Sequence, residues 1–343
     1  MASKKFLVIR FSSIGDIVLT TPVLRVLHQQ VRAEIHYLTK PAFASIIEVN
    51  PNVTKVYTLQ EDFDQMIRML RDEQYDYVID LHHNIRTRRI ILALKRPSHS
   101  FRKLNFEKWL MVNFKINRLP DKHIVDRYLD TIKFLGILND QQGLDFFIPD
   151  EKKINVFEKF GFQPDTYTCI VIGATYYTKC LTADQIATLC EILDMPVILL
   201  GGKQEIEKAE EILSKSNSKN IKSACGAYDI FQSASILNQS AAIISHDTGL
   251  MHIAAALKKP QIVIWGNTIP GFGMYPYYGN ENIKWISFEQ KGLSCRPCTK
   301  LGFDKCPKGH FKCILDHSLK EIASATVSLI NSEDQKDSPI LNA

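Results

Sequence analysis

The sequence predicts an α/β fold built from two Rossmann-like halves that face one cleft. Strand-like and helix-like segments alternate along the whole chain, which is the pattern of mostly parallel sheets covered by helices. The 343 residues also exceed the size at which one hydrophobic core keeps growing, so two domains are expected. We place an N-terminal domain at residues 1–155, a C-terminal domain at 156–330 and a polar tail at 331–343.

The first half begins with an apolar run, a glycine-containing turn and then a helix. This helix has apolar residues at Val23, Leu24, Leu27 and Val31, which share one face. The strands expected in this half are residues 6–11, 35–38, 53–59 and 77–81. Residues 92–112 are basic and only partly helical in pattern.

The second half repeats the alternation. Thr182 and Gln185 have the spacing of a capping box, which predicts the start of a helix that ends near Leu193. The strands expected here are residues 169–172, 197–200, 241–245 and 261–265. The other helices expected are residues 205–214, 229–240, 250–257 and 318–330.

Composition excludes several classes of protein. Hydrophobic residues make up 45% of the chain and charged residues 23%, which argues against a disordered or fibrous protein. No apolar run approaches the roughly 18 residues of a membrane-spanning helix. The first residues show no signal-peptide cleavage pattern, so we expect a cytoplasmic protein.

Positive charge is concentrated in the first half. Residues 82–133 hold 13 basic and 4 acidic side chains, and 12 of the 13 arginines precede residue 151. Guanidinium groups match phosphate and carboxylate geometry well. A solvated basic face is the ordinary interpretation, and an anion-binding half is the functional one.

A polar turn, Ser12-Ser13-Ile14-Gly15-Asp16, follows the first strand. Ligands of open α/β sheets bind at the carboxyl ends of strands, so this turn has the position of a functional site. Its single glycine disagrees with the three-glycine dinucleotide fingerprint, which disfavours a dehydrogenase. Asp16 either caps the following helix or takes part in chemistry.

Two further polar loops follow strands in the second half. Residues 245–252 read Ser-His-Asp-Thr-Gly-Leu-Met-His, and the N–H groups at such a helix start bind phosphate or diphosphate. Residues 173–179 place Thr175 and Lys179 after another strand, where both could contact phosphate oxygens. Each loop alone is also compatible with an ordinary capped turn.

These loops, in this order, resemble glycosyltransferase family 9, the ADP-heptose:lipopolysaccharide heptosyltransferases, over residues 6–330. The resemblance implies the two-domain GT-B fold, with Asp16 as the catalytic base and Lys179 as the residue that stabilises the leaving group. After Lys179 this sequence departs from the K-x-W-P of its relatives. The donor-binding residues implied are Thr175, Lys179, Glu205 (with Glu207 as a fallback), Asp247, Thr248, Gly249, Leu250 and His252.

The resemblance implies an inverting, metal-independent transfer of heptose from ADP-heptose to the inner core of lipopolysaccharide. The acceptor would be an anionic lipid-linked glycan at the cytoplasmic face of the inner membrane, with Phe106 and Trp109 at the membrane interface. A nucleic-acid partner is not expected, because no binding fold for it is recognised. Candidates from the basic stretch to bind this acceptor are Arg86, Arg88, Arg89 and Lys103, together with Ser13 of the first loop; a plain basic surface is the alternative for the stretch.

Two other functions stay open. One is a GT-B glycosyltransferase with a different nucleotide sugar or glycan acceptor. The other is a non-catalytic sugar-phosphate-binding protein stapled by zinc. Asp16 distinguishes these classes, since a binding protein needs no base in that turn.

Metal-ligating residue types occur at two places. The spacing of Asp62 and Asp64 fits the D-x-D pattern of metal-dependent glycosyltransferases, but helix capping explains Asp62 and no catalytic metal is expected. A cysteine-rich loop at residues 292–314 carries a C-x2-C pair and two more cysteines. A structural zinc site, reduced thiols and disulfides are the alternatives for Cys295, Cys298, Cys306 and Cys313.

Overall fold

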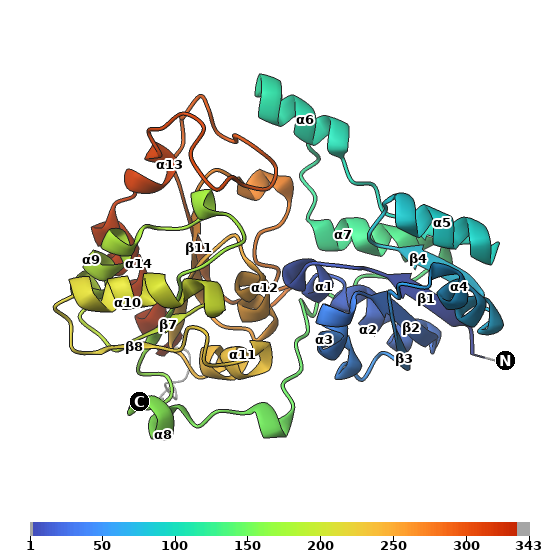
Figure 1. Ribbon diagram of the computed structural model, residues 1–343, viewed down its shortest axis with the longest axis horizontal. Coiled ribbons are helices and arrows are strands. Elements are labelled where there is room, and N and C mark those ends of the chain that lie inside the picture. The colour runs from blue at the N-terminus through green and yellow to red at the C-terminus, as the bar shows by residue number, and fades with distance from the viewer. Residues whose placement is uncertain (1–2, 335–343) are drawn as a thin grey trace, which may run out of the picture. The chain divides into compact units, whose positions relative to one another are not determined.

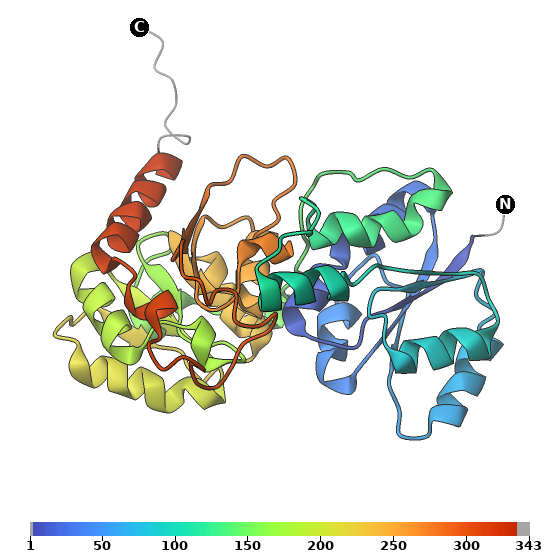
Figure 2. The same ribbon diagram turned by 90° about the horizontal axis from the view of Figure 1, so that it is seen from above.

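The computed structural model describes residues 3–334, which form two compact α/β units. The first unit comprises the described residues up to Asn105 together with Pro120–Phe147 and Tyr277–Glu281. The second comprises Phe106–Leu119, Ile148–Pro276 and the described residues from Asn282 onward. In Figures 1 and 2 each unit is a sheet covered by helices.

The sheet of the first unit has five parallel strands in the order β3-β2-β1-β4-β5. The alternation of side chains in β1 sends Leu7 and Ile9 to one face, where they pack with Met66 of α4 and Ile90 of α5. Phe6 and Val8 are buried on the opposite face. The strands are β1 (Lys5–Ile9), β2 (Glu34–Thr39), β3 (Lys55–Thr58), β4 (Tyr77–Asp80) and β5 (Ser98–Ser100).

Helices of the first unit follow the strands in turn. The expected helix at Val23–Val31 is confirmed as α2, which starts at Thr21 with a proline in its first turn. The helices are α1 (Ile14–Val18), α2 (Thr21–Val31), α3 (Ala44–Glu48), α4 (Phe63–Asp72), α5 (Ile85–Leu94) and α7 (Ile124–Leu129), with 3-10 turns at η1 (Pro41–Phe43) and η2 (Asp130–Leu135).

The sheet of the second unit has six parallel strands in the order β11-β10-β9-β6-β7-β8. Ile170 of β6 faces α9, α10 and α14, whereas its neighbours Cys169 and Val171 face α11. Because both faces are covered, every residue of β6, β7, β9 and β10 is buried. The strands are β6 (Thr168–Val171), β7 (Val197–Leu200), β8 (Ile221–Ser223), β9 (Ala242–His246), β10 (Gln261–Trp265) and β11 (Trp285–Glu289).

Capping residues fix where several helices begin. Thr182 and Gln185 form the expected capping box at α9, and Asp62 caps α4 by accepting from the N–H of Gln65. The helices of the second unit are α6 (Asn105–Phe114), α8 (Val156–Phe160), α9 (Ala183–Leu193), α10 (Ile206–Lys215), α11 (Ile230–Asn238), α12 (Gly249–Ala256), α13 (Lys312–Leu315) and α14 (Leu319–Asp334). Four 3-10 turns accompany them, η3 (Asp150–Lys152), η4 (Tyr177–Lys179), η5 (Lys203–Glu205) and η6 (Pro270–Phe272).

Several elements differ from expectation. The edge strands β5, β8 and β11 were not expected, and residues 92–112 contain the end of α5, β5 and most of α6. The helix α14 continues to Asp334, into the segment expected as a tail, and residues 335–343 lie outside the described residues. Within the described part of the chain, no helix is long and apolar enough to cross a membrane.

Candidate active site

Asp16 occupies the third position of α1, directly after the turn that follows β1. Its Oδ2 accepts from the backbone N–H of Ser13 at 3.2 Å and from the Ser13 hydroxyl at 3.0 Å. The same oxygen lies 2.7 Å from Nη2 of Arg10. These contacts leave Oδ1 as the oxygen that can accept a further proton, so the carboxylate combines a capping contact with a potential chemical role.

Arg10 fixes the Asp16 carboxylate and was not anticipated from the sequence. Its guanidinium is buried and donates to the carbonyls of Ser12 (2.7 Å) and Leu81 (2.6 Å) and to the Tyr128 hydroxyl (3.0 Å). Burial alone would raise the pKa of Asp16, but the charge of Arg10 and the Ser13 donors outweigh it and hold that pKa below its usual range. Asp16 is therefore ionised at neutral pH.

His82 follows β4 and lies near the Asp16 turn. Its ring centroid is 4.8 Å from that of Phe11, and within the described residues its buried Nδ1 has no hydrogen-bond partner. Burial lowers the pKa of His82 to about 4, and the charges of Arg10 and Lys103 act in the same direction. His82 is thus a neutral hydrogen-bonding group beside a cationic cluster.

The predicted acceptor-binding arginines lie together on α5. Arg86, Arg88 and Arg89 are all exposed, and Arg89 stacks over the Phe63 ring at 4.5 Å. The start of α5 is held by Asp80 at the end of β4, which accepts from the Thr87 hydroxyl at 2.8 Å. The helix therefore presents its basic turn from a rigid anchor at a strand end.

In the second unit, Lys179 and Asp247 form an ion pair at the carboxyl ends of β6 and β9. Lys179 Nζ lies 2.7 Å from Asp247 Oδ2, and both side chains are less than a fifth exposed. The hydroxyl of Thr268 donates to the same Asp247 oxygen at 3.0 Å. The structure thus brings together two predicted donor-binding residues that are 68 positions apart in the chain.

Thr248 begins α12 next to this ion pair. Its side chain makes no capping bond, and its buried Oγ1 has no hydrogen-bond partner within the described residues. Gly249 and Leu250 form the first turn of α12, and His252 follows on the same helix. A helix start with free N–H groups, a buried unpaired hydroxyl and an adjacent ammonium group is suited to bind an anion.

Glu205 lies at the ends of β6 and β7, where the ribose contact is expected. Its Oε2 accepts from the N–H of Gly202 at 2.8 Å. A Cβ on Gly173 would come within 2.4 Å of the Glu205 side chain, so this glycine is needed for close packing. Thr175 is exposed in the same loop, and the fallback residue Glu207 is exposed on α10.

The partly buried Lys208 and the buried His246, which were not predicted as site residues, hold the loop that carries Lys179. Lys208 donates to the carbonyls of Ile172 (2.8 Å) and Leu181 (2.7 Å), at either end of the loop, and burial lowers its pKa. His246 accepts from the N–H of Leu181 at 3.0 Å, and burial lowers its pKa to about 3. Lys208 carried no signal in the sequence. His246 stands in the polar loop at residues 245–252, but its contact with Leu181 could not be predicted there, because the two residues are distant in the chain.

The cysteine-rich loop follows β11 and runs into α13, so that Cys295, Cys298 and Cys306 lie in irregular chain and Cys313 lies in α13. Cys295 Sγ lies 3.6 Å from Nε2 of His310, and all eight cysteines of the chain are free thiols. Among the described residues, only Glu34, His36 and Glu73 form a set of three metal-ligating atoms within 4.8 Å of one another. The thiols are therefore near one another without forming such a set.

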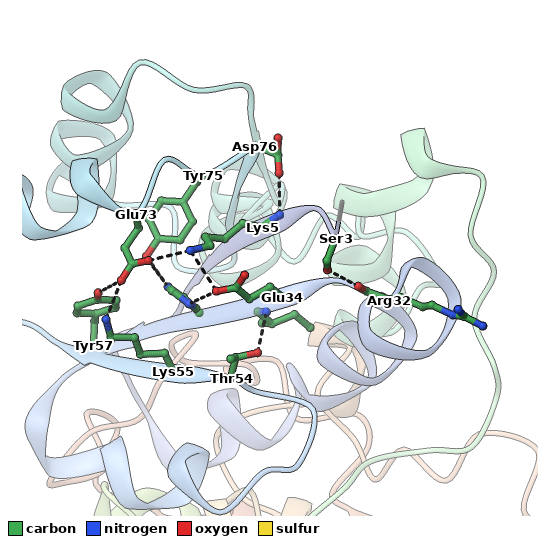
Figure 3. A network of polar contacts seen from close by, with 12 residues as sticks. Ser3, Lys5, Arg32, Glu34, Thr54, Lys55, Tyr57, Glu73, Tyr75 and Asp76 are labelled. Carbon is green, nitrogen blue, oxygen red and sulfur yellow. Dashed lines mark hydrogen bonds and ion pairs between the residues drawn. The ribbon is translucent and has the colours of Figure 1, made fainter. Parts of the chain in front are cut away.

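That set of three lies near the amino ends of β1 and β2, whereas Asp16 follows the carboxyl end of β1; Figure 3 shows Glu34 and Glu73 among the polar contacts at the amino ends. Glu73 accepts from Lys5 at 2.9 Å, from Lys55 at 2.7 Å and from the Tyr57 hydroxyl, and Glu34 lies 3.1 Å from Lys5. Two ammonium groups already supply the positive charge that these carboxylates need. We interpret the cluster as a structural network of ion pairs and hydrogen bonds that connects the strands to the end of α4.

The chain is similar in sequence to proteins of one glycosyltransferase family. A family model described as "Glycosyltransferase family 9 (heptosyltransferase)" matches residues 64–301. The chain is 27% identical over 289 residues to lipopolysaccharide heptosyltransferase 1 of Campylobacter coli. The aligned region covers 77% of this chain and 84% of that protein.

Two solved structures share the fold. The glycosyl transferase family 9 protein of Veillonella parvula DSM 2008 superimposes with a TM-score of 0.75 and 22% identity, covering 96% of this chain and 98% of that one. The E. coli ADP-heptose LPS heptosyltransferase II superimposes with a TM-score of 0.73 and 19% identity, and the superposition covers 96% of this chain and 99% of that one. The predicted fold class, α/β with two parallel sheets, is confirmed and matches GT-B heptosyltransferase structures.

Proposed function

The chain belongs to glycosyltransferase family 9, the heptosyltransferases, and from this premise we propose that it transfers heptose from ADP-heptose to the inner core of lipopolysaccharide. The similar proteins that carry lipopolysaccharide heptosyltransferase names support this substrate class, and ADP-heptose appears in the name of one of the two similar structures.

The observation that carries the proposal is the anion site at the start of α12. Lys179 lies 2.7 Å from Asp247, and the adjacent Thr248 has a buried hydroxyl with no partner in the described part of the chain. A diphosphate would accept from Thr248, from the free N–H groups of the first turn and from Lys179. Glu205 would accept from a ribose hydroxyl of the same nucleotide.

Asp16 would act as the base. Its Oδ2 is occupied by Ser13 and Arg10, so Oδ1 would take the proton from the acceptor hydroxyl as that oxygen attacks the anomeric carbon. Because the pKa of Asp16 is low, the carboxylate depends on position and not on basicity.

The leaving group would depart from the opposite face of the sugar. The bond from the anomeric carbon to the diphosphate oxygen breaks as the new glycosidic bond forms, which inverts the configuration. Lys179 and the N–H groups at Thr248 and Gly249 would stabilise the charge that grows on ADP. No step in this scheme requires a divalent metal ion.

The acceptor would bind to the first unit. Ser13 adjoins Asp16, and the exposed Arg86, Arg88 and Arg89 on α5 would contact phosphate and carboxylate groups of an anionic lipid-linked glycan, together with Lys103. Such an acceptor would hold the protein at the cytoplasmic face of the inner membrane as a peripheral protein.

A donor panel tests the proposal. Purified protein is incubated with a Kdo-containing core acceptor and with ADP-heptose or other nucleotide sugars, and nucleotide release is measured. Acceptor-dependent ADP release with ADP-heptose alone is expected. Preference for another nucleotide sugar would identify a different donor, and no release with any donor would indicate a binding protein. NMR of the product determines its anomeric configuration and so tests inversion. EDTA should not change the transfer rate if the reaction is independent of metal ions.

We also propose that the cysteine-rich loop binds a structural zinc ion through Cys295, Cys298, Cys306 and Cys313. The proximity of Cys295 to His310 and the irregular chain that carries Cys295, Cys298 and Cys306 support a site that closes on metal binding. Metal analysis should give about one zinc per chain. A zinc-free protein with unchanged unfolding would refute the site.

A further inference from the structure

The helix α6 (Asn105–Phe114) exposes aromatic side chains where a water-facing helix would expose polar ones. Phe106 is 66% exposed, Trp109 50% and Phe114 59%, and none of the ten residues of α6 is buried. The rings form one cluster, with centroids 6.1 Å apart for Phe106 and Trp109 and 5.2 Å apart for Trp109 and Phe114. Ile116, just after the helix, is also exposed.

Lys108 of α6 and Lys115, which follows the helix, contact other elements of the same unit. Lys108 Nζ lies 5.7 Å from the centre of the Phe272 ring. Lys115 Nζ donates to the carbonyls of Cys295 (3.2 Å) and Pro297 (2.8 Å). Three aromatic rings of this helix therefore contact solvent while two neighbouring ammonium groups contact protein, which is the reverse of what these side chains usually do on a surface helix.

Charge around α6 indicates what would cover the rings. Residues 102–122 hold six basic and two acidic side chains, a local charge of +4. A second copy of the chain would bring the same positive charge against this surface, which is repulsive. Aromatic rings flanked by lysine and arginine are instead the pattern of helices that lie in the headgroup region of anionic bilayers.

We propose that α6 is the membrane-docking element of this protein, with Phe106, Trp109 and Phe114 inserted into the headgroup region of an anionic bilayer. Ten helical residues span about 15 Å, enough to lie in the plane of the interface but not to cross it. The inference rests on the proposed function in one respect, since a lipid-linked acceptor requires the enzyme to reach a membrane surface.

Vesicle sedimentation tests the proposal. Wild type should bind vesicles of 70% phosphatidylcholine and 30% phosphatidylglycerol, and binding should weaken with added NaCl or with phosphatidylcholine alone. The double substitution Phe106→Ser/Trp109→Ser should weaken binding by about tenfold or more. The matched control is Phe157→Ser, which removes an exposed phenylalanine from α8 and should leave binding unchanged.

Trp109 fluorescence gives an independent readout. Addition of the anionic vesicles should shift the wild-type emission to the blue. Trp109→Phe should remove most of that shift, because Trp265 is already buried and Trp285 is partly buried and stacked on Tyr275. Unchanged vesicle binding by the double variant would overturn the proposal. So would a dimer, seen by sedimentation velocity, that the double variant dissociates while neither protein binds vesicles.

Activity measurements separate this inference from the proposed function. The double variant should transfer heptose normally to a deacylated, water-soluble acceptor and poorly to an acceptor embedded in vesicles. If no ADP-heptose transfer occurs with either acceptor, the proposed function fails while the vesicle result still stands. If both acceptors are used equally well by the variant, the docking role fails and the proposed function stands.

Discussion

Replacement of Asp16 by Asn gives the sharpest test of the site, because it changes the charge while preserving the shape. Asparagine can still accept from the Ser13 N–H and hydroxyl, which lie 3.2 and 3.0 Å from Oδ2. It cannot take a proton from an attacking hydroxyl. If Asp16 is the general base, turnover should fall by about 10²- to 10⁴-fold.

The same substitution should also lower the free energy of unfolding, and the contacts of Arg10 set an upper limit on this loss. Arg10 loses its carboxylate partner at 2.7 Å but keeps the carbonyls of Ser12 and Leu81 and the Tyr128 hydroxyl. Because the Asn oxygen that replaces Oδ2 can still accept from Arg10, the loss is the negative charge of the partner and not the hydrogen bond. The free energy of unfolding should therefore fall by at most about 1.5–3 kcal/mol. Urea unfolding measures this loss of stability. The double variant Asp16→Asn/Arg10→Gln should regain part of the lost free energy of unfolding, because it leaves no unpaired buried charge.

Nucleotide release and calorimetric binding of ADP-heptose then separate chemistry from structure. The expected variant is folded at the assay temperature, binds the donor with near-normal affinity and turns over at least a hundredfold more slowly. Turnover within tenfold of wild type would refute the role of Asp16 as base. Loss of donor affinity in parallel with turnover would instead show that Asp16 organises the fold around the site.

The pH dependence of kcat/KM provides a signature that a purely structural residue would not give. Because the pKa of Asp16 lies below its usual range, wild type should show no acid limb from Asp16 above about pH 5. Arg10→Gln removes the charge that lowers this pKa, and burial then raises it. The acid limb of that variant should move to higher pH, and an unmoved limb would argue against the assignment.

Three further outcomes are expected. Lys179→Met should lower kcat by about 10²-fold, because one stabilising contact to the departing diphosphate is lost, and steady-state kinetics with saturating acceptor measures it. Alanine at Arg86, Arg88 and Arg89 together should raise the acceptor KM and leave donor affinity unchanged by calorimetry; a changed donor affinity would contradict an acceptor role. Glu73→Gln should lower the free energy of unfolding by about 1–2 kcal/mol at pH 7. The pKa of Glu73 is lowered to about 2, because the contacts with Lys55, Tyr57 and Lys5 outweigh burial. The wild type should therefore lose its stability advantage over the variant as the pH falls from about 4.5 toward 2. Urea unfolding at several pH values would measure this loss.

The central strands and the capped helices were predictable because their signals are local. The capping box at Thr182 and the cap at Asp62 each depend on residues within one turn, and both occur as expected. The edge strand β5 was missed because its three residues are polar and short. It forms through backbone pairing with β4, such as Val78 with Ser98, which no periodicity reveals.

The site was predictable only for residues that stand in motifs. Arg10 appeared as a lone basic residue at the end of an apolar run, and its role depends on Leu81 and Tyr128, which are 71 and 118 positions away. Lys208 lies outside every motif. His246 stands in the loop at residues 245–252, but no side-chain pattern indicates its contact with the N–H of Leu181, which is 65 positions away. Residues that position a site through distant main-chain contacts thus remain invisible until the fold is known.

The cysteine-rich loop contacts the loops on both sides of the Lys179–Asp247 pair, which gives it a function even without chemistry of its own. Phe303 exchanges hydrogen bonds with Thr178, the neighbour of Lys179, at 2.9 and 3.1 Å. Arg296 donates to the carbonyl of Thr268 at 2.8 Å, and the Thr268 hydroxyl holds Asp247. Loosening this loop should therefore disturb the ion pair from both sides, so that any bond that closes the loop, a metal–thiolate bond included, would preorganise the donor site.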